Sequence, residues 1–134
     1  MRLGVNVPNF GPGTDPDVLR RWTLTVEGLH PLRFTPGWLT GALDRMKAIA
    51  AELRRPPPAL VPRIALQLTP SPVTGEDRLA GQGTVEQVTG DLEQLRSLGA
   101  DTVVLDPFNG DPEETAHPEA AWQALATVAG RGTR

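Results

Sequence analysis

Hydrophobic positions along this chain fall into short continuous runs separated by longer stretches with helical spacing. Short apolar runs bounded by turn residues are typical of buried β-strands. The last run, residues 101–106, is continuous enough to be buried on both faces of a sheet. The pattern predicts strands over residues 3–8, 28–32, 63–69 and 101–106.

A stretch with helical spacing of apolar residues follows each predicted strand. Thr35 followed by Pro36 marks one helix start, because a threonine side chain caps free N–H groups and proline fits the first turn. Thr84 and Gln87 form a capping-box pattern at another start. The predicted helices cover residues 14–25, 36–53 and 85–98, and a last helix holds Trp122, Leu125 and Val128.

The alternation of strands and helices predicts an α/β protein with a parallel four-stranded sheet. Four β/α units are half of a (β/α)8 barrel, which takes about 250 residues when complete. The 134 residues of the chain suffice for one hydrophobic core. We therefore predict a single domain over 1–134, a partial TIM-barrel-like (β/α)4 half-barrel, with its first unit at 1–26 and the other units at 27–134.

Composition narrows the classes of function. The formal net charge is −3, which gives no electrostatic footprint for nucleic acid or an anionic membrane surface. Cysteine is absent and only two histidines occur, so we expect neither a disulfide nor a metal centre. No apolar run approaches the roughly 20 residues that span a bilayer. The N-terminus does not have a signal-peptide pattern, so a cytoplasmic location is expected.

Three stretches of the sequence resemble one enzyme family. Residues 2–11 contain Gly-Val-Asn-Val-Pro-Asn-Phe-Gly, similar to the opening strand of bacterial-luciferase-like monooxygenases. Residues 27–31, Glu-Gly-Leu-His-Pro, resemble the late Asp-Gly-Trp-His-Pro element of that family. Residues 83–88 and 99–108 look like its C-terminal unit. Together the stretches cover most of the chain in the family's order.

The resemblance implies a flavin- or F420-dependent oxidoreductase, with FMN or coenzyme F420 as cofactor and a small-molecule substrate. In the family several β/α units separate the opening unit from the Asp-Gly-Trp-His-Pro element, whereas only residues 18–26 lie between the corresponding stretches here. The chain thus resembles an internally truncated member that lacks the middle strands with most cofactor and substrate contacts. In a closed barrel the first strand lies beside the last, so the retained strands form one arc.

An arc of four strands leaves two open edges, so we expect the chain to dimerise. Residual monooxygenase or hydride-transfer activity is the first hypothesis. The alternative is a non-catalytic half-barrel that pairs with itself or with a full-length homologue. A poorly folding product of a decaying gene is the third.

Candidate site residues lie at the ends of predicted strands, where barrel enzymes place their active sites. Asn6, Asn9 and Phe10 are candidates for contact with the flavin ring or substrate, or else turn and packing residues. His30 could act as an acid or base, or form a structural hydrogen bond. Asp106 could orient a substrate hydroxyl, or cap the turn that follows it.

Two further patterns allow more than one interpretation. The long loop over 70–83 is either functional or disordered. The glycine-rich run at 81–84 before a helix could bind phosphate, although the capping box already explains Thr84. The tryptophans are expected to pack in the core; they are Trp22, Trp38 and Trp122.

Overall fold

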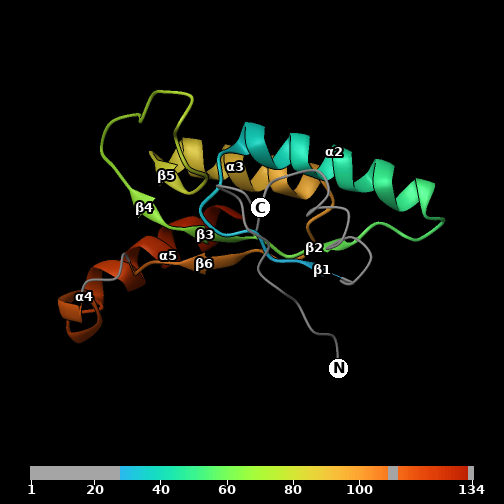
Figure 1. Ribbon diagram of the computed structural model, residues 1–134. Helices are drawn as coiled ribbons and strands as arrows, with labels where there is room; N and C mark the ends of the chain where they lie inside the picture. Colours follow the sequence, from blue (N-terminus) through green and yellow to red (C-terminus); the bar gives the residue numbers. More distant parts are fainter. Residues whose placement is uncertain (1–27, 109–111, 133–134) are drawn as a thin grey trace.

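The structure is a computed structural model that describes residues 28–108 and 112–132 (Figure 1). The first predicted β/α unit, with the candidate residues Asn6, Asn9 and Phe10 and with Trp22, lies outside the described residues.

Helices separate groups of strands in the described part of the chain, as the hydrophobic pattern predicts, but four short strands follow one another between the first two long helices. The three longest helices are α2 (Pro36–Glu52), α3 (Val85–Ser97) and α5 (Glu119–Gly132). A short helix that the pattern does not predict, α4 (Pro112–Ala116), precedes α5. The strands are β1 (Gly28–Leu29), β2 (Ala59–Leu60), β3 (Arg63–Ala65), β4 (Gln67–Leu68), β5 (Gln82–Gly83) and β6 (Val104–Asp106).

Both predicted helix caps are confirmed. The Thr35 hydroxyl accepts a hydrogen bond from the backbone N–H of Trp38 at the start of α2. At the start of α3 the Thr84 hydroxyl accepts from the Gln87 N–H, and the Gln87 side chain accepts from the Thr84 N–H at 3.1 Å. These bonds satisfy N–H groups that the first helical turn leaves unpaired, so the local sequence fixes where both helices begin.

The expected four-stranded sheet is replaced, in the residues that the structure describes, by three parallel pairs: β1–β2, β3–β6 and β4–β5. Single bridges join Leu32 to Arg63 and Leu60 to Ala100. The first two pairs thus belong to three neighbouring parallel segments, 28–32, 59–65 and 100–106, in chain order. The α/β class and the parallel direction are confirmed, and a continuous four-stranded ladder is not.

Two prolines explain why the ladder is interrupted. Pro31 and Pro62 occupy the gaps between the strands, and a proline has no N–H to donate to a neighbouring strand. Hydrogen bonds continue on either side of them, from the Val61 N–H to the Leu29 carbonyl and from the Arg63 N–H to the Pro31 carbonyl. The segments therefore stay side by side although the regular strands are short.

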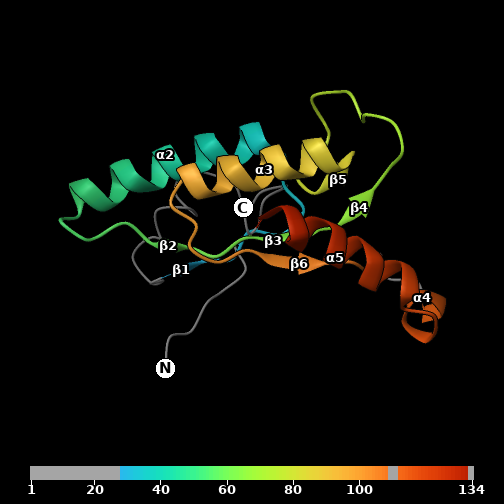
Figure 2. The same ribbon diagram turned by 180° about the vertical axis from the view of Figure 1, so that it is seen from behind.

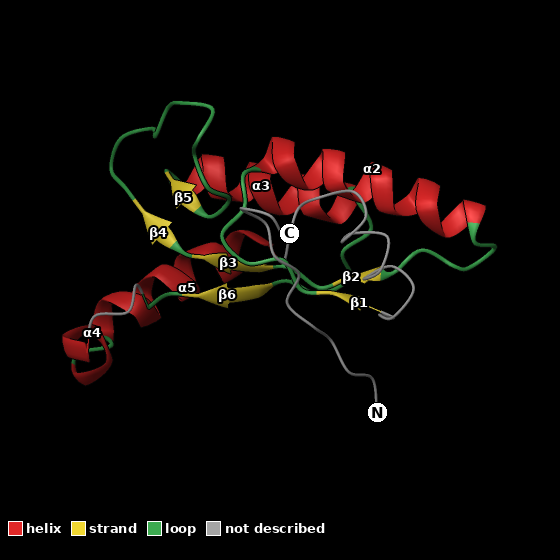
Figure 3. Cartoon of the chain, in the orientation of Figure 1, coloured by secondary structure: helices red, strands yellow, loops and turns green. Residues whose placement is uncertain are grey.

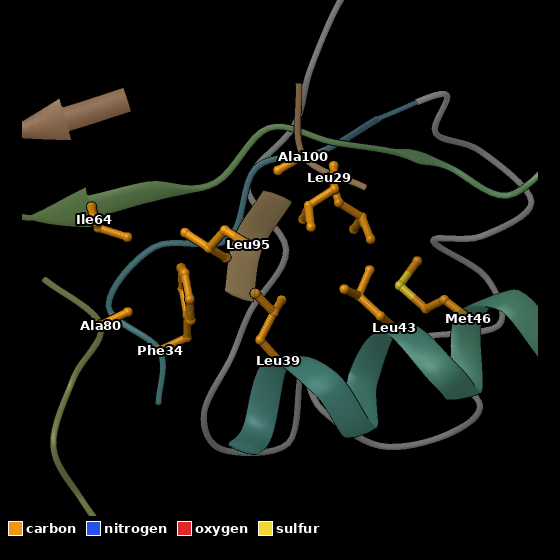
Figure 4. Close-up of a cluster of buried hydrophobic side chains, with 10 residues drawn as sticks. Leu29, Phe34, Leu39, Leu43, Met46, Ile64, Ala80, Leu95 and Ala100 are labelled. Carbon is orange, nitrogen blue, oxygen red and sulfur yellow. The ribbon is translucent and has the colours of Figure 1, made fainter. Parts of the chain in front are cut away.

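The described elements form two layers, with α2 and α3 side by side over one face of the strands (Figures 1 and 3). Ile64, which is 1% exposed, points toward this helical layer (Figure 4). The core between the layers joins strand residues to one face of α2 and to α3, including Leu29, Leu39, Leu43, Met46, Ile64 and Leu95.

A second cluster of buried side chains attaches α5 to α3, so that α3 lies between the two other long helices. It contains Leu66, Val88 and Val128. Trp38 packs against the first cluster, as expected of a core tryptophan. The same expectation is wrong for Trp122, which is 63% exposed, because it lies on a flank of α5 that faces neither the strands nor α3 in the described structure.

Candidate functional site

A groove in the described part of the molecule lies where the parallel strands end. Its volume is about 450 Å³. One wall is formed by Gln67 and Leu68 of β4, and the other by residues of α4 and α5 that include Glu114 and Gln123. Pro107, directly after β6, completes it. Figure 2 shows β4, α4 and the end of β6 at the same end of the molecule. The carboxyl ends of parallel strands are where α/β proteins place their ligands.

The groove is polar without being positively charged. Gln67, Gln123 and Thr127 offer amide and hydroxyl groups, and Glu114 and His117 offer a carboxylate and an imidazole. No lysine or arginine is among the described residues that line it. A cofactor phosphate is normally held by cationic side chains or by converging N–H groups. The groove therefore suits a neutral or cationic polar molecule, and its described residues do not fit the phosphate of FMN or F420.

Asp106 lies beside this groove, one residue before Pro107, with its carboxylate already engaged. Its Oδ2 accepts hydrogen bonds from Arg63 Nε at 3.1 Å and Nη2 at 2.5 Å. Its Oδ1 accepts from the Phe108 N–H at 3.2 Å. The hydrogen bond from the Phe108 N–H is the turn cap, one of the two roles that the sequence suggests for Asp106. A substrate hydroxyl would have to compete with Arg63 for the other oxygen.

His30 lies elsewhere on the same set of strands. Its Nδ1 donates to the Val61 carbonyl at 2.6 Å, which ties the first segment to the second and leaves Nε2 for other contacts. The pairing of Leu29 with Leu60 places His30 level with Val61, whereas Asp106 pairs with Ala65. Four residues of strand separate these levels by roughly 13 Å. The structure thus does not bring the two described candidates into one site.

The loop over 70–83 is anchored to α3 by a charged pair that sequence patterns did not reveal. The Asp91 carboxylate is buried, with 3% of its side chain exposed, and accepts two hydrogen bonds from Arg78 at 2.9 and 2.5 Å. It also accepts from the Gly81 N–H at 2.9 Å. The hydrogen bond with Asp91 raises the pKa of Arg78 above its ordinary value. The Arg78–Asp91 pair holds the 70–83 loop against α3, and this loop contacts one wall of the groove.

The anchored loop in turn supports one wall of the groove. Gln82 of β5 pairs with Gln67 of β4, and their side chains share a hydrogen bond of 3.0 Å. Gly81, next to β5, has φ of 91°, and a Cβ there would meet the Ala65 carbonyl oxygen at 2.5 Å. Only glycine lets the loop pass this close to the strand. Asp91 therefore positions Gln67 through a chain of backbone contacts.

The glycine-rich run at 81–84 serves this anchoring rather than a phosphate. The Gly81 N–H donates to Asp91, and the Thr84 N–H donates to the Gln87 side chain. These two N–H groups are therefore already used within the protein and are not available to a phosphate. The capping-box interpretation of Thr84 is confirmed.

Two other kinds of feature, a metal site and a membrane span, are absent from residues 28–108 and 112–132. No cluster of three histidine or acidic side chains there could hold a metal ion. Among the helices of this part, none has the length and hydropathy that a membrane span requires.

Comparison with known proteins places the fold. No family model and no curated protein sequence matches the chain. A solved structure that does match is an F420-dependent secondary alcohol dehydrogenase in complex with an F420-acetone adduct, with a TM-score of 0.55 and 10% sequence identity. The match covers 93% of this chain and 47% of that one, so the chain spans about half the length of the enzyme it resembles. At this identity the likeness concerns the fold.

Proposed function

We propose that this chain supplies half of the catalytic cavity of an oxidoreductase with the luciferase-like fold. The observation that carries the proposal is the match of 93% of the chain to 47% of an F420-dependent alcohol dehydrogenase, in an arc of parallel strands with an open groove at their carboxyl ends. Because that neighbour is a dehydrogenase, hydride transfer with F420 is favoured over monooxygenation with FMN. The deazaflavin, when bound, would supply the hydride chemistry.

The described residues contribute to substrate binding rather than to cofactor binding. Gln67, Gln123 and Thr127 provide donors and acceptors that orient a small polar molecule such as an alcohol or ketone. The described residues that line the groove include no cation for the cofactor phosphate, so those contacts must come from residues outside the described part or from a second polypeptide. Asn6, Asn9 and Phe10 remain candidates for contact with the cofactor ring or the substrate.

Fluorescence titration of the purified 134-residue chain with F420 and with FMN tests the proposal. We expect saturable binding of F420, with a weaker or absent response to FMN. The matched variants are Gln67→Ala in the groove and Gln94→Ala, whose exposed side chain lies on α3 away from the groove. The first should weaken the binding of a small alcohol to the cofactor-loaded protein, and the second should not. Absence of binding for both cofactors would exclude the proposal.

A non-catalytic half-barrel is the second candidate, and one observation favours it. His30 and Asp106, the candidates that the structure describes, both make hydrogen bonds within the fold. In that case the chain would pair with itself or with a full-length homologue and act structurally. Copurification of an intact homologue from the native source, with no cofactor bound by the isolated chain, would favour this function over the first.

A further inference from the structure

The side chain of Gln67, on the β4 wall of the groove, ends in a carboxamide with one accepting and one donating branch. Its Oε1 accepts a hydrogen bond from Nε2 of Gln82 at 3.0 Å. The described part of the chain offers its Nε2 no hydrogen-bond partner. Since the oxygen faces Gln82, the branch that remains for the groove is the donor. Gln67 therefore presents N–H groups, and not a carbonyl oxygen, to a bound molecule.

A backbone group fixes the orientation of both amides. The oxygen and nitrogen of a carboxamide have nearly the same shape, so packing alone does not decide which of them faces a neighbour. The Leu79 N–H donates to Oε1 of Gln82 at 3.2 Å. Because a backbone N–H can only donate, the Gln82 oxygen must face Leu79 and its Nε2 must face Gln67. The reverse orientation would place the Gln82 amide hydrogens against the Leu79 N–H.

The anchored loop holds this arrangement in place from outside the groove. Nη1 of Arg78 donates both to the Gln82 carbonyl at 2.7 Å and to the Asp91 carboxylate at 2.9 Å. The Gln82 N–H donates to the Leu79 carbonyl at 3.2 Å, which closes the turn that carries the Leu79 N–H. Gln82 and Gln67 are direct partners in the parallel pair of β5 and β4, so their side chains lie on the same face. Of these residues, only Gln67 lines the groove.

We propose that Gln82 is a positioning residue, which makes Gln67 a hydrogen-bond donor and so selects ligands that place an accepting oxygen at the β4 wall. The carbonyl of a ketone meets this requirement, and so does the oxygen of an alcohol. An ammonium group, which can only donate, does not. The ligand class of the groove is thereby narrowed to neutral carbonyl and hydroxyl compounds. This inference rests on the proposed function in taking the groove as the substrate site.

Couplings across hydrogen bonds test the orientation of the amides in the ligand-free chain. Long-range HNCO-type NMR experiments correlate a donor nitrogen with the carbon of the carbonyl that accepts its hydrogen. We expect one correlation from the Leu79 amide nitrogen to Cδ of Gln82, and another from Nε2 of Gln82 to Cδ of Gln67. A correlation from Nε2 of Gln67 to Cδ of Gln82 requires the opposite polarity and would overturn the proposal.

A substitution outside the groove should reverse the polarity of Gln67. In Gln82→Glu the introduced carboxylate accepts from the Leu79 N–H and also faces Gln67 with an acceptor. The Gln67 amide then turns its Nε2 toward the carboxylate and its oxygen toward the groove. Cyclohexanone, which can only accept, should bind about three- to tenfold more weakly than to the wild type. Cyclohexanol, which can also donate, should lose less affinity.

Both affinities are measured by NMR titration of the cofactor-free chain, with the Gln67 side-chain amide resonances as the probe of binding. Gln94→Glu adds the same charge at an exposed position of α3 away from the groove, and it should leave both affinities unchanged. Gln82→Met is a second test without an added charge. It frees the Gln67 amide to rotate and should also weaken the binding of cyclohexanone more than that of cyclohexanol.

Equal affinity for cyclohexanone in the wild type, Gln82→Glu and Gln82→Met would overturn the proposal, as would a wild-type chain that does not bind it. Circular dichroism checks that each variant is folded. Because every measurement uses the chain without cofactor, failure of this inference is distinct from failure of the proposed function, which the fluorescence titration with F420 detects.

Discussion

The two faces of the strand layer differ in how completely they are covered. On the helical face Ile64 is 1% exposed and belongs to a cluster shared with α2 and α3. The neighbouring positions on the other face are open, with Val104 39% exposed and the Arg63 side chain 42% exposed. In a complete barrel this second face would point into a packed interior.

The contrast indicates that the helical face contributes most of the free energy of unfolding. The helical face is a finished core, in which buried side-chain polar groups of the described residues all have hydrogen-bond partners. The open face combines the Arg63–Asp106 ion pair with the exposed Val104. Such a surface suits contact with further parts of a barrel. Substitutions on the helical side should therefore cost much stability, and equivalent substitutions on the open side should cost little.

The largest effect on stability is expected at the buried ion pair between Arg78 and Asp91, which joins the 70–83 loop to α3. Asp91→Ala leaves the Arg78 guanidinium without its carboxylate partner in a site where 17% of the Arg78 side chain is exposed. We expect a loss of about 3–5 kcal/mol in the free energy of unfolding, measured by urea denaturation. Asp44→Ala, at an exposed position of α2, is the control and should change it little. Equal stability of the two variants would contradict the anchoring role of Asp91.

A pair of truncations compares the faces directly. Ile64→Ala removes a side chain from the core and should cost about 2–5 kcal/mol, because the cavity left behind cannot collapse fully. Val104→Ala on the open face should cost about 1 kcal/mol or less in the dissociated chain. Urea denaturation at low protein concentration measures both. If the two substitutions cost the same, the distinction between a finished and an open face is wrong.

A smaller effect is expected at the charged pair on the open face. In the isolated chain Arg63 and Asp106 are partly exposed, so at low protein concentration their interaction should contribute about 0–1 kcal/mol. A double-mutant cycle with Arg63→Ala and Asp106→Ala isolates this contribution from the loss of the Phe108 turn cap. A coupling energy well above this range would mean that the pair is buried in solution, as it would be inside an assembled barrel.

Local signals in the sequence predicted the helices well. The caps at Thr35 and Thr84 depend on neighbouring residues only, and both form as the sequence predicts. The parallel direction of the segments 28–32, 59–65 and 100–106 also follows from local order, because α2 connects the first to the second and α3 connects the second to the third. The four-stranded ladder could not be predicted as reliably, since Pro31 and Pro62 become adjacent only when the segments pair.

Features that depend on distant partners were not visible in the sequence. Asp91 occupies a core-facing position of α3, and its partner Arg78 lies in a loop without periodicity. The exposure of Trp122 depends on what lies beside α5, which helical spacing alone does not reveal. His30 and Asp106 were both placed at strand ends, but the register that separates them is set by tertiary pairing.

Amide hydrogen exchange at the β6 edge tests the central claim, that this chain supplies half of a barrel-type cavity and that another polypeptide completes it. Val104 donates to Pro62 within one molecule, whereas the Leu105 N–H points toward the open edge. By residue-resolved NMR we expect both amides to be protected at high protein concentration, and only Val104 to stay protected when dilution dissociates the assembly. Fast exchange of Leu105 at high protein concentration, at the same rate as in the diluted protein, would contradict the account.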